Sequence, residues 1–161
     1  MELSDLAQAV GERLQKRGMM LVTAESCTGG WVAQEITAIP GSSAWFERGF
    51  VTYTNTAKQE MLGVSLDILE QHGAVSEETV REMAGGALKH SHAQISLAVS
   101  GVAGPSGGSA VKPVGTVCFG WAQKGAEPVS RKMLFSGDRE SVRRQAVVFA
   151  LRGVLDLLKD G

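Results

Sequence analysis

A serine and a cysteine stand side by side where an apolar run gives way to a pair of glycines. The segment from residue 25 to residue 30 reads Glu-Ser-Cys-Thr-Gly-Gly. A serine becomes a useful nucleophile only when a base takes its proton and hydrogen-bond donors receive the developing oxyanion. At a turn from a strand into a helix, the N–H groups of Thr28, Gly29 and Gly30 can supply such donors. The segment predicts either acyl chemistry at Ser26 or a phosphate site.

The residue types alone leave simpler interpretations of this segment open. Ser26 at the start of a helix is the usual position of a capping residue. Cys27 is a rival nucleophile, because a helix N-terminus lowers the pKa of a thiol, but a small buried cysteine is equally typical of a core. Without a partner that can act as a base, none of these alternatives is decided.

Lys58 and Tyr53 are the candidates for that base system. Lys58 is expected in the first turn of a helix, where the helix dipole disfavours a cation, so a purely structural lysine is poorly placed there. Burial would lower its pKa and leave a neutral amine able to accept a proton. Tyr53, the only tyrosine, is expected at the end of a strand, where its phenol could relay a proton. A solvated Lys58 and a core Tyr53 are the plain alternatives.

The three histidines suggest no catalytic role. His72 precedes a glycine, and His90 and His92 lie near the end of a polar helix. These are ordinary positions for a cation near a helix C-terminus. No acid–histidine pattern marks a Ser-His-Asp triad, and no cluster has the spacing of metal ligands, so we expect neither a metal nor a cofactor.

Two further polar segments could contribute to a site. Residues 101–109 form a loop rich in Gly, Ser and Pro that suits an anionic ligand, although it lacks the Gly-Lys-Ser/Thr ending of a P-loop. Lys112, just beyond it, could bring a cation to the same edge. Ser136 to Arg139, with Arg143 and Arg144, forms another polar corner, for which helix capping and surface solvation are the simplest explanations.

The elements that would position these residues alternate between helices and strands. In the first half we expect a helix over 3–14 that ends at Gly18, a strand over 19–23, a helix from Trp31 to Ile39 and a strand over 45–54. Thr54, Ser76 and Asp138 fit N-caps, the last two for helices that reach about residue 90 and residue 158. A short helix is expected over 66–71. Later strands are expected at 95–100, 114–122 and 129–135, the last two as an antiparallel hairpin. We expect close packing at the pair Gly85 and Gly86.

This pattern predicts an α/β fold: a three-layer α/β/α sandwich with a mixed, mostly parallel sheet that includes a C-terminal antiparallel hairpin. The chain has 161 residues, which fits a single domain over 1–161. The net charge of −1 suggests no nucleic-acid or membrane partner. Two cysteines make no disulfide framework, and a cytoplasmic location is the simplest interpretation.

Six motifs, in order along nearly the whole chain, resemble the CinA C-terminal domain family. They are Ala24-Glu-Ser-Cys-Thr-Gly-Gly30, Gly49-Phe-Val-Thr-Tyr-Thr-Asn55 with Lys58, Gly73-Ala-Val-Ser76, Ser100-Gly-Val-Ala-Gly-Pro105, Lys112-Pro-Val-Gly-Thr-Val117 and Phe135-Ser-Gly-Asp-Arg139. The resemblance implies hydrolysis of the carboxamide of nicotinamide mononucleotide to nicotinate mononucleotide and ammonia, a step in pyridine nucleotide salvage.

The resemblance also implies roles for individual residues. Ser26 would be the nucleophile of a metal-free amidohydrolase, with Tyr53 and Lys58 completing the catalytic group. The implied substrate is a small nucleotide, and the implied assembly is a homodimer. A non-catalytic nucleotide- or phosphate-binding module that uses the same glycine-rich corner is the alternative. The predicted substrate-binding or oxyanion residues are Cys27, Thr28, Gly29, Gly30, Ser42, Ser100, Gly101, Ala103, Gly104 and Thr116.

Overall fold

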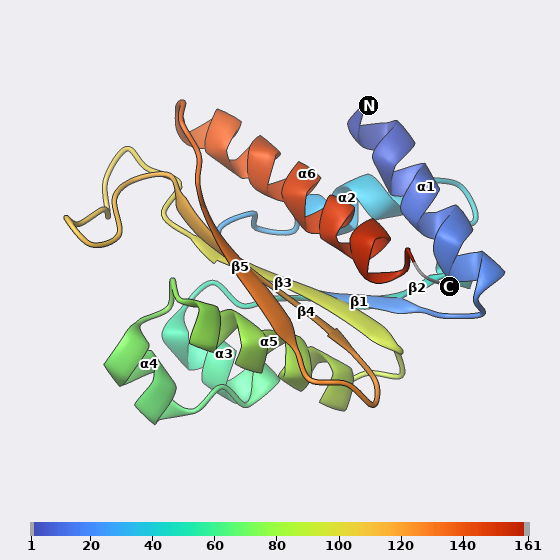
Figure 1. The fold of residues 1–161 in the computed structure, drawn as a ribbon, viewed down its shortest axis with the longest axis horizontal. Helices are drawn as coiled ribbons and strands as arrows, with labels where there is room; N and C mark the ends of the chain where they lie inside the picture. The colour runs from blue at the N-terminus through green and yellow to red at the C-terminus, as the bar shows by residue number, and fades with distance from the viewer. Residues whose placement is uncertain (1, 160–161) are drawn as a thin grey trace.

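The computed structural model describes residues 2–159, and at its centre lies a five-stranded mixed sheet (Figure 1). The strand order is β2-β1-β3-β4-β5. β2, β1 and β3 are parallel, whereas β4 is antiparallel to both of its neighbours. This arrangement confirms the predicted sandwich with a C-terminal hairpin. The strands are β1 (Leu21–Glu25), β2 (Phe46–Val51), β3 (Ile95–Gly101), β4 (Thr116–Gln123) and β5 (Val129–Leu134).

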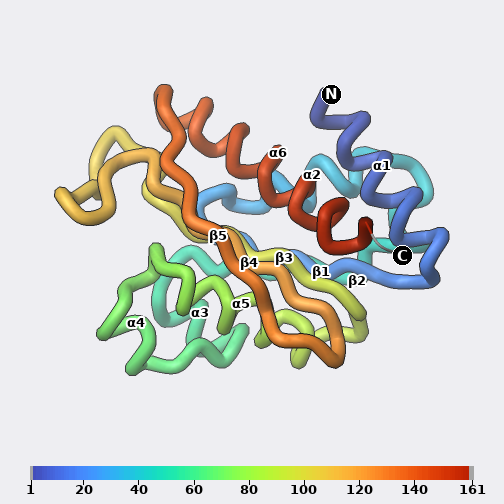
Figure 2. Tube along the Cα trace, viewed as in Figure 1, coloured from blue at the N-terminus to red at the C-terminus, as the bar shows by residue number. Residues whose placement is uncertain are grey.

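Helices cover both faces of the sheet (Figures 1 and 2). One face carries α1 (Leu3–Lys16), α2 (Trp31–Thr37) and α6 (Arg139–Leu157). The other carries α3 (Asn55–Leu62), α4 (Leu66–His72) and α5 (Glu77–Lys89), and a short 3-10 helix (Ser42–Ala44) precedes β2. An apolar cluster fills each interface between sheet and helices. Burying one Leu, Val or Phe side chain in such a cluster stabilises the fold by about 1.5–3 kcal/mol.

Side-chain caps set the starts of several helices. The hydroxyls of Thr54 and Ser76 and the carboxylate of Asp138 each accept a hydrogen bond from a backbone N–H three residues later. These three predicted caps are confirmed. The cap at Thr54 also explains why β2 ends at Val51, earlier than the predicted 54, because the chain must turn into α3 there. The first strand is shifted similarly, to Leu21–Glu25 from the predicted 19–23.

The two glycines inside α5 play different parts. A Cβ added at Gly86 would lie 1.9 Å from the carbonyl oxygen of Leu62, so only glycine allows α3 and α5 to approach this closely. A Cβ added at Gly85 would meet nothing within 4 Å. The expectation of close packing is therefore correct for Gly86 and wrong for Gly85.

The position of β1 in the sheet determines where a ligand site can form. From β1 the chain crosses to β2 on one side and later returns to β3 on the other, so β1 lies between two parallel neighbours. In open α/β sheets, ligands bind beyond the carboxyl ends of the strands at such a change of direction. In Figure 2 the turn after β1 and the loop between β3 and β4 lie at the same end of the sheet.

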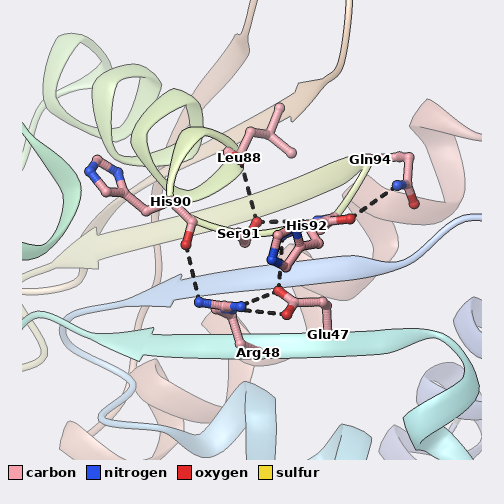
Figure 3. Close-up of polar contacts among 8 residues, drawn as sticks. Glu47, Arg48, Leu88, His90, Ser91, His92 and Gln94 are labelled. Atoms are coloured by element: carbon pink, nitrogen blue, oxygen red, sulfur yellow. Dashed lines mark hydrogen bonds and ion pairs between the residues drawn. The ribbon is translucent and has the colours of Figure 1, made fainter.

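A surface network of charged and polar groups occupies the opposite end of the sheet (Figure 3). Arg48 donates to the Glu47 carboxylate at 2.7 and 2.9 Å and to the carbonyl oxygen of His90 at 3.3 Å. The backbone N–H of His92 donates to Glu47 at 3.2 Å. His90 and His92 therefore lie at the amino end of β3, away from the turn that follows β1, and this placement agrees with the expectation that they take no part in a triad.

Candidate active site

Ser26 lies at the turn that follows the carboxyl end of β1. Its backbone N–H donates to the carbonyl oxygen of Val99 at 3.0 Å, which continues the pairing of β1 with β3 by one residue. The side chain is 6% exposed, so the hydroxyl is nearly enclosed while still lining a pocket. Because the sheet fixes the backbone of Ser26, its hydroxyl projects from a defined position. This favours a reactive role over simple helix capping. It caps no helix: the N–H groups at the start of α2 bond elsewhere.

Lys58 brings an amine directly to that hydroxyl. The Nζ atom lies 3.0 Å from Ser26 Oγ and 2.9 Å from the carbonyl oxygen of Thr52. Lys58 lies in the first turns of α3. Because Thr54 caps that helix, the local sequence determines the position of the Lys58 backbone. Ser26 and Lys58 meet because β2 pairs directly with β1, which places the start of α3 beside the turn after β1.

The surroundings of Lys58 favour its neutral form. The side chain is 1% exposed, and no carboxylate in residues 2–159 forms an ion pair with it. Burial lowers the pKa of the Lys58 ammonium from 10.5 to about 8. At pH 7 about a tenth of the Lys58 amine is therefore neutral. A neutral amine at 3.0 Å can accept the proton of Ser26.

Cys27 has the opposite electrostatic character. Burial raises the pKa of its thiol from 9.0 to about 12, more than the nearby Arg143 and Lys58 lower it. The thiolate, which is the nucleophilic form, is thus disfavoured. The burial of the Cys27 thiol and the 3.0 Å contact between Ser26 Oγ and Lys58 Nζ together favour Ser26 over Cys27 as the nucleophile.

Tyr53 contributes its backbone to the buried group and its side chain to the rim of the pocket. Its carbonyl oxygen lies 3.4 Å from Lys58 Nζ and 3.5 Å from Ser26 Oγ. The side chain is 62% exposed, and its phenolic oxygen accepts a hydrogen bond from Arg139 at 3.4 Å. Because Lys58 contacts Ser26 directly, a proton relay through the phenol of Tyr53 is not needed.

A buried carboxylate, Glu25, occupies the donors at the start of α2. It is 1% exposed and accepts hydrogen bonds from the N–H groups of Gly30, Val32 and Ala33 at 3.2, 2.9 and 3.0 Å. The hydroxyl of Thr28 also donates to it, at 2.6 Å. The sequence reasoning missed this role. A signal was present: α2 begins at a glycine pair with no Ser, Thr, Asp or Asn cap, so its donors needed another acceptor.

The pocket in front of Ser26 has a volume of about 260 Å³. Seven predicted site residues line it: Ser26, Cys27, Tyr53, Lys58, Ser100, Gly101 and Ala103. Three unpredicted residues complete the lining, namely Ala74, Val75 and Arg139. Larger hollows of about 360 Å³ beside Phe149 and about 450 Å³ around Ser76 contain no comparable pair of hydroxyl and buried amine.

Other predicted residues lie outside the pocket lining. Gly104 contributes indirectly, because its carbonyl oxygen accepts a hydrogen bond from Arg139 at 2.7 Å. The hydroxyl of Thr116 donates to Pro113 at 2.6 Å and supports the loop from within. Ser42 lies in the 3-10 helix before β2, at the opposite end of the parallel strands from Ser26. Gly29 and Gly30 shape the turn, and their N–H groups donate to Ser26 and Glu25.

Two arginines of the polar corner at the start of α6, Arg139 and Arg143, contribute to the site. Capping explains Asp138, but Arg139 lines the pocket and Arg143 donates to the carbonyl oxygens of Cys27 and Thr28. Surface solvation alone therefore does not explain either arginine. For Arg139 the signal was the one that marked Lys58, because a cation in the first turn of a helix is unfavourable unless something holds it there.

The family model for the CinA C-terminal domain matches residues 3–158. The chain belongs to this family. It is 58% identical over 151 residues to the nicotinamide-nucleotide amidohydrolase PncC of Escherichia coli K12, covering 94% of this chain and 92% of the relative. The protein of the same name from Pseudomonas putida is 52% identical over 155 residues and covers 96% of each chain.

Solved structures show the same fold. A competence/damage inducible protein from Agrobacterium tumefaciens superposes with a TM-score of 0.94 at 44% identity, covering 96% of this chain and 94% of that one. A CinA superfamily protein from Klebsiella pneumoniae gives a TM-score of 0.95 at 40% identity and covers both chains fully. These superpositions cover nearly the whole chain, including the elements that carry Ser26 and Lys58.

Three further features concern the part of the chain that the structure describes. Residues 2–159 contain no group of three or more His, Cys, Asp or Glu side chains placed to hold a metal ion. Within the same range, every helix is too short or too polar to cross a membrane. Cys27 and Cys118 are both buried and unpaired.

Proposed function

We propose that this protein is an amidase that hydrolyses the carboxamide of nicotinamide mononucleotide to nicotinate mononucleotide and ammonia, in pyridine nucleotide salvage. The observation that carries the proposal is the 3.0 Å contact between Ser26 Oγ and the buried Nζ of Lys58. Close relatives named nicotinamide-nucleotide amidohydrolase support the substrate. The pairing of a nucleophile with an uncharged amine supports the reaction class.

In the first half of the reaction, Ser26 attacks the carboxamide carbon while neutral Lys58 accepts the hydroxyl proton. A tetrahedral oxyanion forms and is stabilised by backbone N–H donors. Lys58 then returns the proton to the amide nitrogen, the C–N bond breaks, and ammonia leaves. The product of this half is an ester between Ser26 and the nicotinoyl group. The positive pyridinium ring helps, because it withdraws electrons from the carbonyl and also disfavours protonation of the nearby Lys58.

In the second half, a water molecule attacks the ester carbon and transfers its proton to Lys58. The bond to Ser26 breaks, the proton returns to the serine oxygen, and nicotinate mononucleotide is released. Lys58 thus acts as base and then as acid in each half, and the site returns to its starting protonation state. No metal or cofactor takes part in this scheme.

The phosphate of the substrate is expected near Arg139. Of the residues that line the pocket, Lys58 and Arg139 carry the cationic groups, and Lys58 is engaged at Ser26. Arg139 is exposed and is held by Gly104 and Tyr53 at the pocket mouth. A guanidinium binds phosphate well because its donors match two phosphate oxygens at once. This placement leaves the carboxamide end of the substrate free to reach Ser26.

Glu25 weakens the alternative of a non-catalytic phosphate-binding module. That hypothesis uses the glycine-rich corner as the phosphate site, but the Glu25 carboxylate already accepts hydrogen bonds from Gly30, Val32 and Ala33 there. A phosphate placed there would meet a carboxylate instead of open N–H groups. Tight binding of the mononucleotide without release of ammonia would nevertheless favour the module over the amidase.

The direct test is to incubate purified protein with nicotinamide mononucleotide and measure ammonia together with nicotinate mononucleotide. We expect both products in equal amounts from the wild-type protein. Ser26→Ala should release none above background, because it removes the hydroxyl that contacts the Lys58 amine. Its circular dichroism spectrum and Tm should match those of the wild type, since the hydroxyl lies in a pocket wall and no helix depends on it.

Cys27→Ala separates the serine mechanism from a thiol mechanism. Ammonia release by this variant should stay within about tenfold of wild type, because the substitution leaves Ser26 and Lys58 in place. Turnover by Ser26→Ala combined with loss of turnover in Cys27→Ala would reverse the assignment of the nucleophile.

Assembly as a homodimer and a cytoplasmic location are proposed from the family resemblance. Size-exclusion chromatography with light scattering tests the first proposal, and fractionation of cells that express the full chain tests the second. A monomer that retains full ammonia release would remove the dimer from the proposal without affecting the chemistry.

A further inference from the structure

The N–H groups around Ser26 can be accounted for one by one. The N–H of Ser26 donates to Val99, that of Gly29 to the carbonyl oxygen of Ser26, and that of Gly30 to Glu25. The N–H groups of Trp31, Val32 and Ala33 donate to Thr28 or Glu25. Among residues 2–159, the N–H groups of Cys27 and Thr28 donate to no other residue. These two donors follow the serine directly.

The directions of the two peptide groups follow from planarity. In a trans peptide, the C=O of one residue and the N–H of the next point in opposite directions. Arg143 Nε donates to the carbonyl oxygen of Cys27 at 3.0 Å, which directs the N–H of Thr28 away from α6. The carbonyl oxygen of Ser26 is held by Gly29, which likewise directs the N–H of Cys27 to the opposite side.

The Arg143 side chain makes a second hydrogen bond to the turn and packs on an aromatic ring. Its Nη2 atom also donates to the carbonyl oxygen of Thr28 at 3.1 Å, and its guanidinium carbon lies 5.5 Å from the centre of the Trp31 ring. One guanidinium therefore fixes two successive carbonyl groups of the turn while packing on the first residue of α2. Glu25 fixes the same turn from the other side through Thr28 and Gly30.

We propose that the backbone N–H groups of Cys27 and Thr28 form the oxyanion hole for the tetrahedral intermediate on Ser26, and that Arg143 is the residue that positions them. Arg143 orients the N–H of Thr28 directly through the carbonyl oxygen of Cys27. It orients the N–H of Cys27 indirectly, because it holds the Thr28–Gly29 peptide whose N–H donates to the carbonyl oxygen of Ser26. This inference rests on the proposed amidase function. It replaces the earlier expectation that Gly29 and Gly30 donate to the oxyanion. Arg143 does not line the pocket, so it acts through the two carbonyl groups and touches no substrate.

The test compares Arg143→Met with wild type on two substrates: nicotinamide mononucleotide and its thioamide analogue. Sulfur accepts hydrogen bonds more weakly than oxygen, so an ordered oxyanion hole favours the oxygen substrate. Loss of positioning should lower kcat by roughly 10- to 100-fold with little change in KM, because the donors act on the transition state. The ratio of kcat/KM for amide over thioamide should fall as well, a change that loss of stability alone does not produce.

Arg144→Met is the matched control. Arg144 is the next residue on α6, is exposed, and lies outside the pocket lining. Its kcat and its amide-to-thioamide ratio should equal those of wild type. Arg143→Lys keeps the positive charge but cannot bond two carbonyl groups at once, so its values should fall between those of wild type and Arg143→Met. If Arg143→Met fails to fold, the same measurements of kcat, KM and the amide-to-thioamide ratio are made on Arg143→Lys.

A serine-directed fluorophosphonate separates failure of this inference from failure of the proposed function. Its phosphoryl oxygen would occupy the oxyanion hole when Ser26 is labelled, whatever the natural substrate is. We expect labelling of Ser26, followed by mass spectrometry, to be slowed in Arg143→Met and unchanged in Arg144→Met. Suppose that the wild type releases ammonia and that Arg143→Met keeps the wild-type kcat and amide-to-thioamide ratio. This result would overturn the inference but would leave the amidase function in place. If wild type releases no ammonia, the amidase fails, and equal labelling rates, or no labelling of Ser26, would overturn the inference too.

Discussion

Two cations beside β2 illustrate how differently this fold uses positive charge. Arg48 lies on the strand itself, in contact with the Glu47 carboxylate, and that partner raises its pKa further (Figure 3). Lys58 follows the carboxyl end of the same strand, is 1% exposed and has no carboxylate partner in the described chain, and burial lowers its pKa to about 8. Arg48 is a permanently charged surface group, whereas Lys58 can exchange a proton near neutral pH.

The comparison shows that burial without a counter-charge is what makes a base. A carboxylate beside Lys58 would raise its pKa and keep it protonated, as Glu47 does for Arg48. The neighbours that Lys58 has are the hydroxyl of Ser26 and the carbonyl oxygens of Thr52 and Tyr53. These groups accept hydrogen bonds without adding negative charge, so they orient the amine and leave it able to lose a proton.

The largest expected change in activity comes from replacing the buried lysine with an arginine. Lys58→Arg should lower kcat/KM for ammonia release by at least about 100-fold, because a guanidinium stays protonated at any working pH and cannot accept the proton of Ser26. The matched exchange at the other end of the sheet, Arg48→Lys, should leave kcat/KM within about twofold, since surface ion pairs contribute little. Near wild-type turnover in Lys58→Arg would remove Lys58 as the base.

A smaller effect is expected from pH. Because the active form of Lys58 is the neutral amine, kcat/KM should rise with pH through the pKa of about 8 and then level off. Below that value the rate should fall about tenfold per pH unit. Measurements between about pH 6.5 and 9.5 avoid titration of the substrate phosphate near pH 6. A profile that is flat over this range would contradict a neutral-amine base.

The smallest expected effect is on stability. Between about pH 8 and 10.5 the unfolded chain keeps the Lys58 proton while the folded protein has largely lost it, so the free energy of unfolding rises with pH. Relative to Lys58→Met, which cannot titrate, the wild type should therefore gain stability across this window, by at most roughly 3 kcal/mol. Paired thermal unfolding curves at pH 7 and pH 10 measure the change in the Tm difference. A Tm difference that stays constant or moves the other way would show that Lys58 is not desolvated in the folded state.

Local patterns in the sequence were sufficient to locate most of the elements and part of the site. Thr54, Ser76 and Asp138 are caps because each precedes a run with helical periodicity, and that relation is contained in a few neighbouring residues. Lys58 was recognisable as unusual for the same kind of reason, since a cation in the first turns of a helix opposes the helix dipole. The family motifs then connected it with Ser26.

Only the tertiary structure decided which groups meet. The sheet order places β2 beside β1 and brings Lys58 within 3.0 Å of Ser26, and α6 returns from the far end of the chain to set Arg143 against the turn. The phenol of Tyr53 points to the pocket rim, and Glu25 occupies donors that looked free for the substrate. The physical reason is that each hydrogen-bond donor serves only the acceptors that packing brings to it, and local spacing carries no information about partners more than a hundred residues away.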